Sequence, residues 1–267
     1  VSLVLQLLEL PWDFSTEMWS CRLTLVEKDA LFSAIEQRTE QRVPLPYITK
    51  QAWFCNYRFN VDERVLIPRS PIAELINHQF EPWLLEVPSR ILDLCTGSGC
   101  IGIAAALEFE DAEVDLFDLS TDALQVAESN IAEYELSERV QAYESDLFEA
   151  LSDPSQFSDG EYVRYDLIVS NPPYVDQQDY QSMPKEYSKE PVIGLIAGDD
   201  GLDIVRRILS EAAKYLSDDG VMIVEVGNSW EALEQAYSDF PFTWVEFEHG
   251  GHGVFVISAE ELKSRNW

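Results

Sequence analysis

Short apolar runs alternate with segments of helical periodicity from residue 90 to the C-terminal end of the sequence. Apolar runs bounded by turn residues are typical of buried strands, and apolar positions three and four residues apart are typical of helices. Their alternation indicates a parallel sheet wound by helices on both faces, so we predict a doubly wound α/β fold with a mostly parallel seven-stranded sheet. The predicted strands are 90–95, 113–117, 140–145, 165–170, 221–226 and an antiparallel pair, 242–248 and 254–257, and the predicted helices are 99–109, 121–134, 202–216 and 229–238.

The start of the sequence, residues 1–46, has helical periodicity without strand-like runs. Its main predicted helix is 24–42, which the prolines of 43–46 end because a residue before proline is pushed to extended angles. The apolar positions that we expect to form the buried face of this helix are Leu25, Leu31, Phe32 and Ile35.

A second pattern covers 47–67, where aromatic and polar residues alternate loosely, as in a hairpin of two strands. Ser70 and Pro71 then mark a helix start, because Ser can accept a backbone N–H at the cap and Pro suits the first helical position. We predict that this helix runs to about Leu85. Arg69, just before it, is either a solvated loop cation or the partner of a carboxylate.

The predicted organisation is therefore an N-terminal helical cap at 1–46, a β-hairpin linker at 47–70 and a main domain at 71–267. The first residue is Val rather than Met, so we expect the cap to continue upstream. The sequence contains neither an apolar run of membrane-spanning length nor a leader-like flank at its start, which favours a cytoplasmic protein.

The charge balance is strongly acidic, with 18 basic and 49 acidic residues and a net charge of −31. Such a surface repels phosphate backbones, so we expect neither nonspecific nucleic-acid binding nor a membrane partner. The acidity fits either a general adaptation that keeps the surface hydrated or the steering of a basic partner. Its scattered distribution favours the first. The four cysteines form no C-x-x-C pair, so we predict reduced thiols and no metal.

A glycine-rich loop at 93–102 joins the first predicted strand of the main sheet to its helix. Gly97, Gly99 and Gly102 satisfy G-x-G-x-x-G, in which glycines permit a sharp turn and a close approach to a ligand. The match alone fits two ligands, a nicotinamide dinucleotide or a nucleoside such as S-adenosylmethionine.

Acidic residues follow the next two predicted strands. Asp118 is placed to accept the ribose hydroxyls that both candidate ligands carry, and Asp146 or its neighbour Leu147 to border an adenine. Each Asp is alternatively a helix cap, although Ser120 can supply the cap beside Asp118.

The loop Asn171-Pro172-Pro173-Tyr174 follows the fourth predicted strand. Its prolines supply carbonyls without N–H groups, Asn171 adds a side-chain amide, and Tyr174 adds an aromatic face with a hydroxyl group. Such a loop suits a flat, uncharged group with N–H donors, namely a carboxamide or an exocyclic amine. The alternative is a turn that only leaves the strand.

These elements follow neighbouring strands, whose carboxyl ends meet at one edge of the sheet, where doubly wound folds bind ligands. An oxidoreductase would leave the Asn-Pro-Pro-Tyr loop without a role. A DNA or RNA amino-methyltransferase would use that loop for a flipped base, but the net charge of −31 speaks against it. A noncatalytic cofactor-binding assembly factor is a further alternative.

The motifs D-L-C-T-G-S-G at 93–99 and N-P-P-Y at 171–174 resemble those of class I S-adenosylmethionine-dependent methyltransferases, and among them the protein glutamine methyltransferases. V-D-E-R-V-L-I-P-R-S-P-I-A-E-L-I at 61–76 and E-V-G-N-S at 225–229 are similar to the branch that acts on large-subunit ribosomal protein L-three. The sister branch, which acts on peptide release factors, usually shows P-R-P-[DE]-T-E where this chain has P-R-S-P-I-A-E at 68–74.

The resemblance implies a Rossmann-like fold, S-adenosylmethionine as cofactor without a metal, and a basic ribosomal protein as partner. The cofactor-binding residues that we predict are Cys95, Thr96, Gly97, Ser98, Gly99, Asp118, Asp146, Leu147 and Asn171. The predicted substrate-binding residues are Arg69, Asn171, Pro172, Pro173 and Tyr174.

The predicted catalytic residues are Asn171, Pro172 and Tyr174. We expect the Asn171 side-chain oxygen and the Pro172 carbonyl each to accept one N–H of the substrate amide, and Tyr174 to pack on the amide plane. Two features depart from the family: the helical start is shorter, and His252 stands between the closing glycines where an acidic residue is expected.

Overall fold

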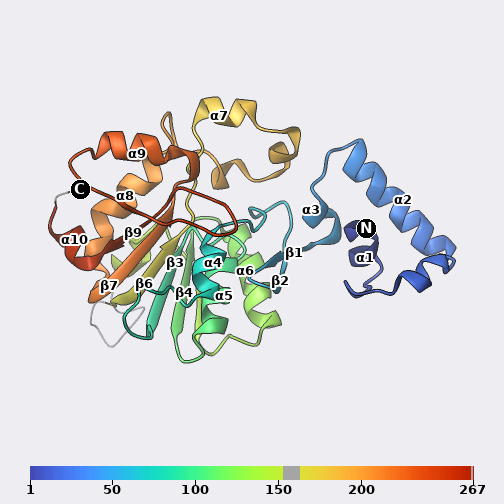
Figure 1. The fold of residues 1–267 in the computed structure, drawn as a ribbon, viewed down its shortest axis with the longest axis horizontal. Coiled ribbons are helices and arrows are strands. Elements are labelled where there is room, and N and C mark those ends of the chain that lie inside the picture. Colours follow the sequence, from blue (N-terminus) through green and yellow to red (C-terminus); the bar gives the residue numbers. More distant parts are fainter. Residues whose placement is uncertain (153–162, 266) are drawn as a thin grey trace.

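The computed structural model describes residues 1–152, 163–265 and 267, and its centre is a seven-stranded sheet (Figure 1). The strand order is β5-β4-β3-β6-β7-β9-β8. Strands β3 to β7 pair in parallel, whereas β9 is antiparallel to both β7 and β8. This confirms the predicted mostly parallel seven-stranded sheet. The strands are β3 (Arg90–Leu94), β4 (Glu113–Asp118), β5 (Val140–Glu144), β6 (Tyr165–Ser170), β7 (Leu216–Glu225), β8 (Thr243–Trp244) and β9 (Val254–Ser258).

Helices cover both faces of this sheet (Figure 1). Residues of α4, α5 and α6 pack with alternate strand residues into one hydrophobic core, and residues of α8, α9 and α10 form a second core on the opposite face. Successive residues of β6 illustrate the division, because Leu167 and Val169 belong to the first core and Ile168 to the second. The helices are α4 (Ile72–Asn77), α5 (Cys100–Glu108), α6 (Thr121–Glu133), α7 (Gln177–Ser182), α8 (Asp203–Glu211), α9 (Trp230–Ala236) and α10 (Ala259–Lys263).

Two predicted helices are too long. Helix α4 ends at Asn77 rather than near Leu85, because the chain turns at Gln79 and Phe80 with φ of 51° and 59° and buries the Phe80 ring against Phe109. The prediction of a helix to residue 216 is also wrong: α8 ends at Glu211, and β7 already begins at Leu216.

The cause of the second error is strand pairing. Leu216 is in register with Tyr165 of β6, and the Tyr165 N–H donates to the Tyr215 carbonyl at 2.8 Å. These bonds to a neighbouring strand hold the chain extended at positions that also have helical periodicity. The strand predicted at 242–248 is also shorter in the structure than predicted, because β8 contains only Thr243 and Trp244.

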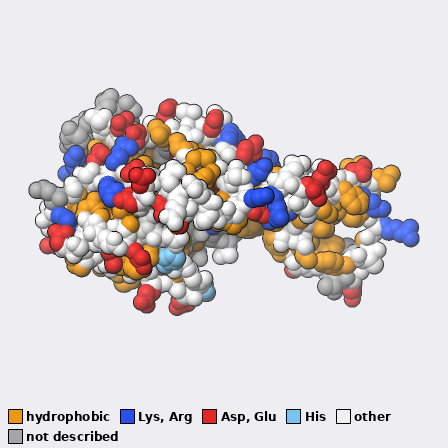
Figure 2. All heavy atoms as spheres, turned by 90° about the horizontal axis from the view of Figure 1, so that it is seen from above, with side chains coloured by type: hydrophobic (Ala, Val, Ile, Leu, Met, Phe, Trp, Pro, Cys, Tyr) orange, Lys and Arg blue, Asp and Glu red, His pale blue; other side chains and the backbone are white. Residues whose placement is uncertain are grey.

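The N-terminal segment projects from the body of the molecule (Figures 1 and 2). It contains α1 (Ser2–Leu7), α2 (Leu25–Thr39) and α3 (Leu45–Thr49). The last of these lies where an extended linker was predicted; Pro46 in its first turn supplies a φ that suits a helix start. None of the described helices combines the length and apolarity that a bilayer-spanning helix requires.

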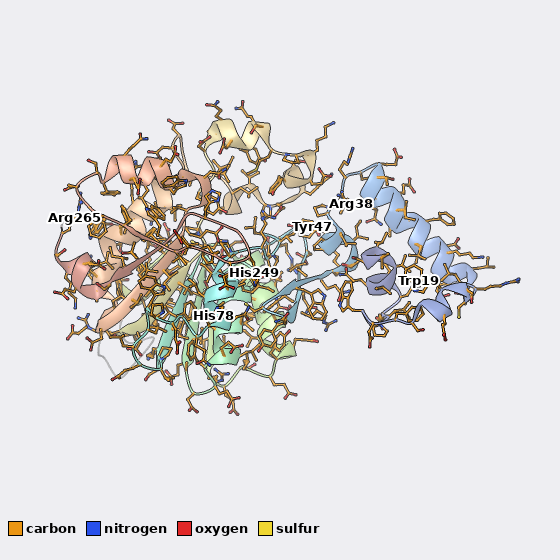
Figure 3. The ribbon with its side chains drawn as sticks, viewed as in Figure 1. Trp19, Arg38, Tyr47, His78, His249 and Arg265 are labelled. Carbon is orange, nitrogen blue, oxygen red and sulfur yellow. The ribbon has the colours of Figure 1, made fainter. Side chains whose placement is uncertain are left out.

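The expected apolar face of α2 is only partly buried. Leu31 is 8% exposed, whereas Leu25 and Phe32 are 78% and 69% exposed. Figure 3 shows Arg38 on this helix, and its guanidinium pairs with Glu186 at 3.1 Å, which links α2 to the segment that follows α7. Tyr47, in α3, is buried and donates to the Val65 carbonyl at 2.6 Å.

The predicted hairpin is confirmed as β1 (Gln51–Phe54) and β2 (Tyr57–Asn60), which pair antiparallel. Asn130 of α6, fully buried, joins this hairpin to the glycine-rich loop. Its side-chain oxygen accepts the Asn60 N–H at 2.7 Å, and its side-chain nitrogen donates to the carbonyls of Ser98 at 2.8 Å and Asn60 at 3.1 Å.

Asn130→Ala is expected to lower the free energy of unfolding by about 3 kcal/mol, because it removes the partners of the buried Ser98 carbonyl and of two half-buried backbone groups of Asn60. Urea unfolding followed by circular dichroism measures this loss. Asn77→Ala, at the exposed end of α4, is the matched control and should change stability by less than about 0.5 kcal/mol. Equal stability of the two variants would contradict the assigned role of Asn130.

Candidate active site

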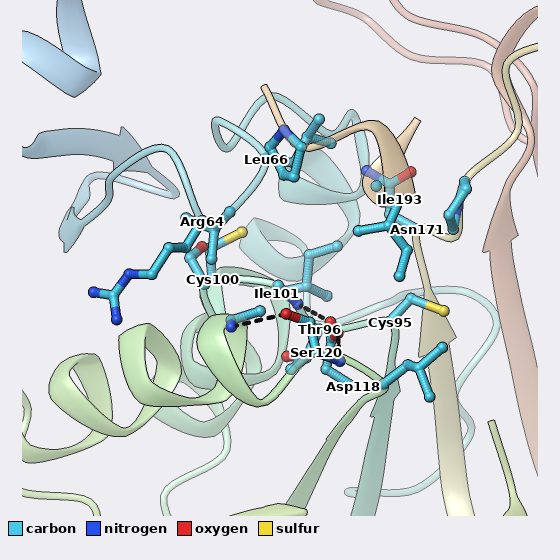
Figure 4. Close-up of a pocket in the computed structure, with 18 of the residues that line it drawn as sticks. Arg64, Leu66, Cys95, Thr96, Cys100, Ile101, Asp118, Ser120, Asn171 and Ile193 are labelled. Carbon is cyan, nitrogen blue, oxygen red and sulfur yellow. Dashed lines mark hydrogen bonds between the residues drawn. The ribbon is translucent and has the colours of Figure 1, made fainter. Parts of the chain in front are cut away.

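A cleft opens at the carboxyl ends of the central parallel strands, with about 1030 Å³ of empty space that is open to solvent. We call it the first cleft. Leu66, Ile193 and Asn171 lie across it from Thr96 and Asp118 (Figure 4). The predicted site residues that line it are Arg69, Cys95, Thr96, Gly97, Ser98, Asp118, Asp146, Leu147, Asn171 and Pro173.

Gly99 is a predicted cofactor residue that does not line the cleft. It caps the N-terminus of α5 with φ of 79°, a left-handed conformation that suits glycine. Gly102, one turn later, packs α5 against β4, since a Cβ there would lie 2.2 Å from Leu116 Cδ2. Gly99 and Gly102 therefore shape the loop and position its helix, whereas Gly97 lies among the loop residues that line the cleft.

Asp93, at the start of this loop, was quoted in the motif but not predicted as a site residue. Its Oδ2 accepts the Thr96 hydroxyl at 2.6 Å and the Gly102 N–H at 2.9 Å. Burial raises the pKa of its carboxyl to about 7. The carboxylate thus holds the two ends of the loop together beneath the cleft.

Asp118 ends β4 and faces the cleft. Its Oδ2 accepts the Gly97 N–H and its Oδ1 the Ser120 N–H, both at 2.8 Å. Burial raises the pKa of this carboxyl, and the backbone hydrogen bonds oppose that shift. Ser120 caps α6 by accepting the Ala123 N–H at 3.2 Å. The helix cap therefore does not depend on Asp118.

Asp146 and Leu147 follow β5 and line the same cleft. Asp146 pairs with Arg207 of α8 at 2.9 Å, a partner that the sequence analysis did not identify. Leu147 is buried and has a left-handed φ of 53°. Asp146 therefore gives this end of the first cleft a carboxylate held by Arg207, and Leu147 gives it an apolar contact.

Asn171 lines the first cleft and also a neighbouring second cleft, which has about 910 Å³ of empty space. The second cleft is further lined by Pro172 and Tyr174. Within the described residues, the buried Asn171 Oδ1 accepts no hydrogen bond. An unpaired buried acceptor costs free energy, so this oxygen is suited to receive a donor from a ligand.

The Tyr174 hydroxyl meets the carboxylate of Glu225, which belongs to the E-V-G-N-S motif at 225–229 and was not predicted as a site residue. This hydroxyl donates to Glu225 Oε1 at 2.7 Å, and the Ser70 hydroxyl donates to Glu225 Oε2 at 2.6 Å. Glu225 is 5% exposed and lines the second cleft. The three residues come from a loop, a helix start and a strand end, and their hydrogen bonds fix the shape of that cleft.

Arg69 lies beside both clefts and is the partner of a carboxylate, the second of the two interpretations of its sequence position. Its Nη1 lies 2.8 Å and 3.0 Å from the two carboxylate oxygens of the buried Glu190. Its guanidinium also lies over the Tyr187 ring, 4.9 Å from the centroid. Because Glu190 neutralises Arg69, this arginine is a wall of the clefts rather than a free cation.

The first cleft fits S-adenosylmethionine on the chemistry of its residues. A carboxylate has about four lone-pair sites, and Asp118 uses two of them for N–H groups, which leaves acceptors for two ribose hydroxyls. Leu119, Leu147 and Ile204 supply apolar contacts for a flat base. In the described part of the chain, no three His, Cys, Asp or Glu residues are grouped as metal ligands.

The family model and the sequence relatives that match this chain all describe methyltransferases. The model of the methyltransferase small domain matches residues 75–186. A ribosomal protein uL3 glutamine methyltransferase from Francisella tularensis is 50% identical over 98% of this chain and 81% of its own length. Its counterpart from Neisseria gonorrhoeae is 44% identical over 98% of this chain and 85% of its own length.

Solved structures share the fold at low identity. The human methyltransferase 10 domain containing protein is 15% identical, with a TM-score of 0.52 over 89% of this chain and 99% of its own. The hMettl16 catalytic domain in complex with MAT2A 3′UTR hairpin 6 is 15% identical, with a TM-score of 0.56 over 90% of this chain and 84% of its own. These likenesses support the methyltransferase fold, and the sequence relatives settle the branch: the chain belongs to the family of ribosomal protein uL3 glutamine methyltransferases.

Proposed function

We propose that this chain transfers a methyl group from S-adenosylmethionine to the side-chain amide nitrogen of a glutamine in ribosomal protein uL3. The relatives at 50% and 44% identity carry this function in their names. The observation that carries the proposal is Asn171 Oδ1, a buried acceptor without a partner among the described residues, at the junction of the two clefts.

The first cleft holds the cofactor in this proposal. Asp118 accepts the ribose hydroxyls, Asp146 and Leu147 border the adenine, and the loop from Cys95 to Gly99 presents its backbone to the rest of the molecule. When bound, S-adenosylmethionine supplies a methyl group already activated by its positive sulfur. The protein therefore has mainly to orient the acceptor and exclude water.

The second cleft holds the glutamine side chain. Its amide nitrogen is a weak nucleophile, because its lone pair is delocalised into the carbonyl group. The Asn171 side-chain oxygen and the Pro172 carbonyl each accept one N–H, which aims the nitrogen toward the first cleft and stabilises positive charge as it develops. Tyr174 covers the amide plane, Pro173 lies on the side of the first cleft, and Arg69, which Glu190 holds in place, lines both clefts.

The reaction does not require a strong general base. When bound, the cofactor would supply the methyl group and keep the electrons of the bond that breaks, the amide nitrogen would form the new bond with its lone pair, and its proton would leave to solvent once the transfer is complete. An N-methylated, positively charged amide is strongly acidic, so the proton departs readily.

A ribosomal protein substrate places the reaction in the cytoplasm. Ribosomal proteins that bind RNA are basic, and a net charge of −31 favours their approach at low salt. The substrate is either free uL3 or uL3 in an assembling large subunit, and the test below includes both.

Methyl-labelled S-adenosylmethionine is incubated with the enzyme and with uL3, or large-subunit particles, from cells that lack the enzyme. Mass spectrometry is expected to find one added methyl group on a single glutamine of uL3. Enzyme omitted from a parallel reaction gives the background. Label on a release factor instead of uL3 would contradict the substrate, and label on nucleic acid would contradict the reaction class.

A further inference from the structure

Glu225 is a buried carboxylate that the mechanism above does not use. It lies at the carboxyl end of β7, beside β6, whose end carries the Asn-Pro-Pro-Tyr loop. Its side chain lines the second cleft together with Pro172 and Tyr174. Burial of a carboxylate costs much free energy unless its oxygens accept hydrogen bonds. The groups that hydrogen-bond to this carboxylate in the wall of the second cleft therefore indicate what it does there.

Those partners are hydroxyl groups that each connect to another element. Ser70 donates to Oε2 at 2.6 Å and accepts the Ile72 N–H at the start of α4 at 3.1 Å. Tyr174 donates to Oε1 at 2.7 Å. The Glu225 carboxylate thus joins the carboxyl end of β7, the start of α4 and the loop that receives the substrate amide.

Tyr174 is held at three places, two on its ring and one on its backbone. Its hydroxyl is held by Glu225, its ring edge packs so closely on Gly227 that a Cβ there would lie 2.5 Å from a ring carbon, and its carbonyl accepts the Ser229 hydroxyl at 2.7 Å. A ring held in this way has one orientation toward the cleft. Of these three contacts, the bond to Glu225 is the one that places a negative charge next to the phenol.

We propose that Glu225 is a positioning residue for methyl transfer that acts through Tyr174: it fixes the ring at the substrate amide and makes the ring face more negative as positive charge develops on the amide nitrogen. This inference rests on the proposed function. The ring of a phenol whose hydroxyl donates a hydrogen bond to a carboxylate is richer in electrons than that of a free phenol. Aromatic faces attract cations, and more so when the site excludes water.

The charged groups around Glu225 set the pH at which this effect is lost. Burial raises the pKa of its carboxyl, whereas the hydrogen bonds from Ser70 and Tyr174 and the charges of Arg69 and His252 lower it by less. These groups come from the segment before α4, the loop after β6 and the loop before β9. The rate is expected to fall as the pH is lowered through this raised pKa, because the protonated carboxyl is neutral and no longer makes the phenol ring more negative.

The test is a double-mutant cycle of Glu225→Gln and Tyr174→Phe. Each single variant should lower kcat about tenfold, with KM for uL3 and the dissociation constant of S-adenosylhomocysteine within about threefold of wild type. The double variant should be no slower than the slower single variant, because the carboxylate acts through the hydroxyl. At saturating S-adenosylmethionine, Glu225→Gln should also lose the part of the fall in kcat at low pH that protonation of Glu225 causes. Glu234→Gln is the matched control, because Glu234 accepts the Trp244 indole N–H at 2.8 Å outside both clefts, and it should keep the wild-type kcat.

Wild-type kcat in Glu225→Gln, or additive losses in the double variant, would overturn the inference. So would a loss of stability in thermal unfolding with an unchanged pH profile. Should Glu225→Gln fail to fold, Tyr174→Phe alone decides: a wild-type rate, or a retained fall at low pH, would refute the link. Methylation by the wild-type enzyme of a protein other than uL3 would contradict the proposed substrate, yet the ratios of variant to wild-type rates remain measurable on that protein.

Discussion

Asn171→Ala is expected to lower kcat for uL3 methylation by about 100-fold or more, the loss typical when one preorganised hydrogen-bonding group is removed from a transition state. The substrate amide would lose one of two acceptors, and its nitrogen could rotate away from the line of attack. The physical basis is the buried Asn171 Oδ1, which has no partner among the described residues. Single-turnover transfer of labelled methyl to uL3 measures the effect.

The control separates catalysis from folding and from cofactor binding. Asn77→Ala removes an exposed amide outside both clefts and should retain the wild-type rate. S-adenosylhomocysteine should bind Asn171→Ala within about fivefold of wild type, because Asp118 and the glycine-rich loop supply most of the polar contacts. A rate within a few-fold of wild type, with this binding intact, would refute the catalytic assignment of Asn171.

Asp118→Ala is expected to raise the dissociation constant of S-adenosylhomocysteine by about 30-fold to 100-fold, or about 2–3 kcal/mol, because two hydrogen bonds from ribose hydroxyls to a carboxylate are lost. The substitution also frees the N–H groups of Gly97 and Ser120, which the carboxylate now binds at 2.8 Å. Isothermal titration measures the binding, and thermal unfolding measures the accompanying loss of stability.

Asp122→Asn is the matched control for this experiment. Asp122 is an exposed carboxylate in the first turn of α6, four residues from Asp118 and away from the first cleft. Its substitution should leave the dissociation constant within about twofold of wild type. Equal binding by Asp118→Ala and wild type would place the ribose elsewhere and contradict the orientation of the cofactor in the first cleft.

The centre of the parallel sheet was predictable because its strands β3, β6 and β7 are mostly buried on both faces. A run such as 165–170 is buried whichever way its side chains point, so periodicity, length and bounding turn residues identify it from the sequence. Helix ends were less predictable. Phe80 and Leu216 continue a helical pattern of apolar positions, yet the Phe109 ring buries Phe80, and β6 pairs with the strand that begins at Leu216.

The gathering of the candidate site residues at one edge of the sheet was also predictable, for a topological reason. Parallel strands present their carboxyl ends at one edge, so residues that follow successive strands meet without any knowledge of their separation along the chain. This reasoning placed Asp118, Asp146 and Asn171 beside one cleft, as the structure does. It could not identify Gly97 as a partner of Asp118 or Arg207 as a partner of Asp146, because these residues come from other parts of the chain.

The order of elements, the edge of the sheet where the candidate site lies and the residue types suited to a nucleoside and an amide follow from the sequence alone, since they depend on local periodicity and on the chemistry of single side chains. The pairing of charges and hydroxyls follows from the tertiary structure. Arg69 meets Glu190 121 residues away, and Tyr174 meets Glu225 51 residues away. Such contacts depend on how the chain packs, because side chains so distant along the sequence come together only in the folded chain.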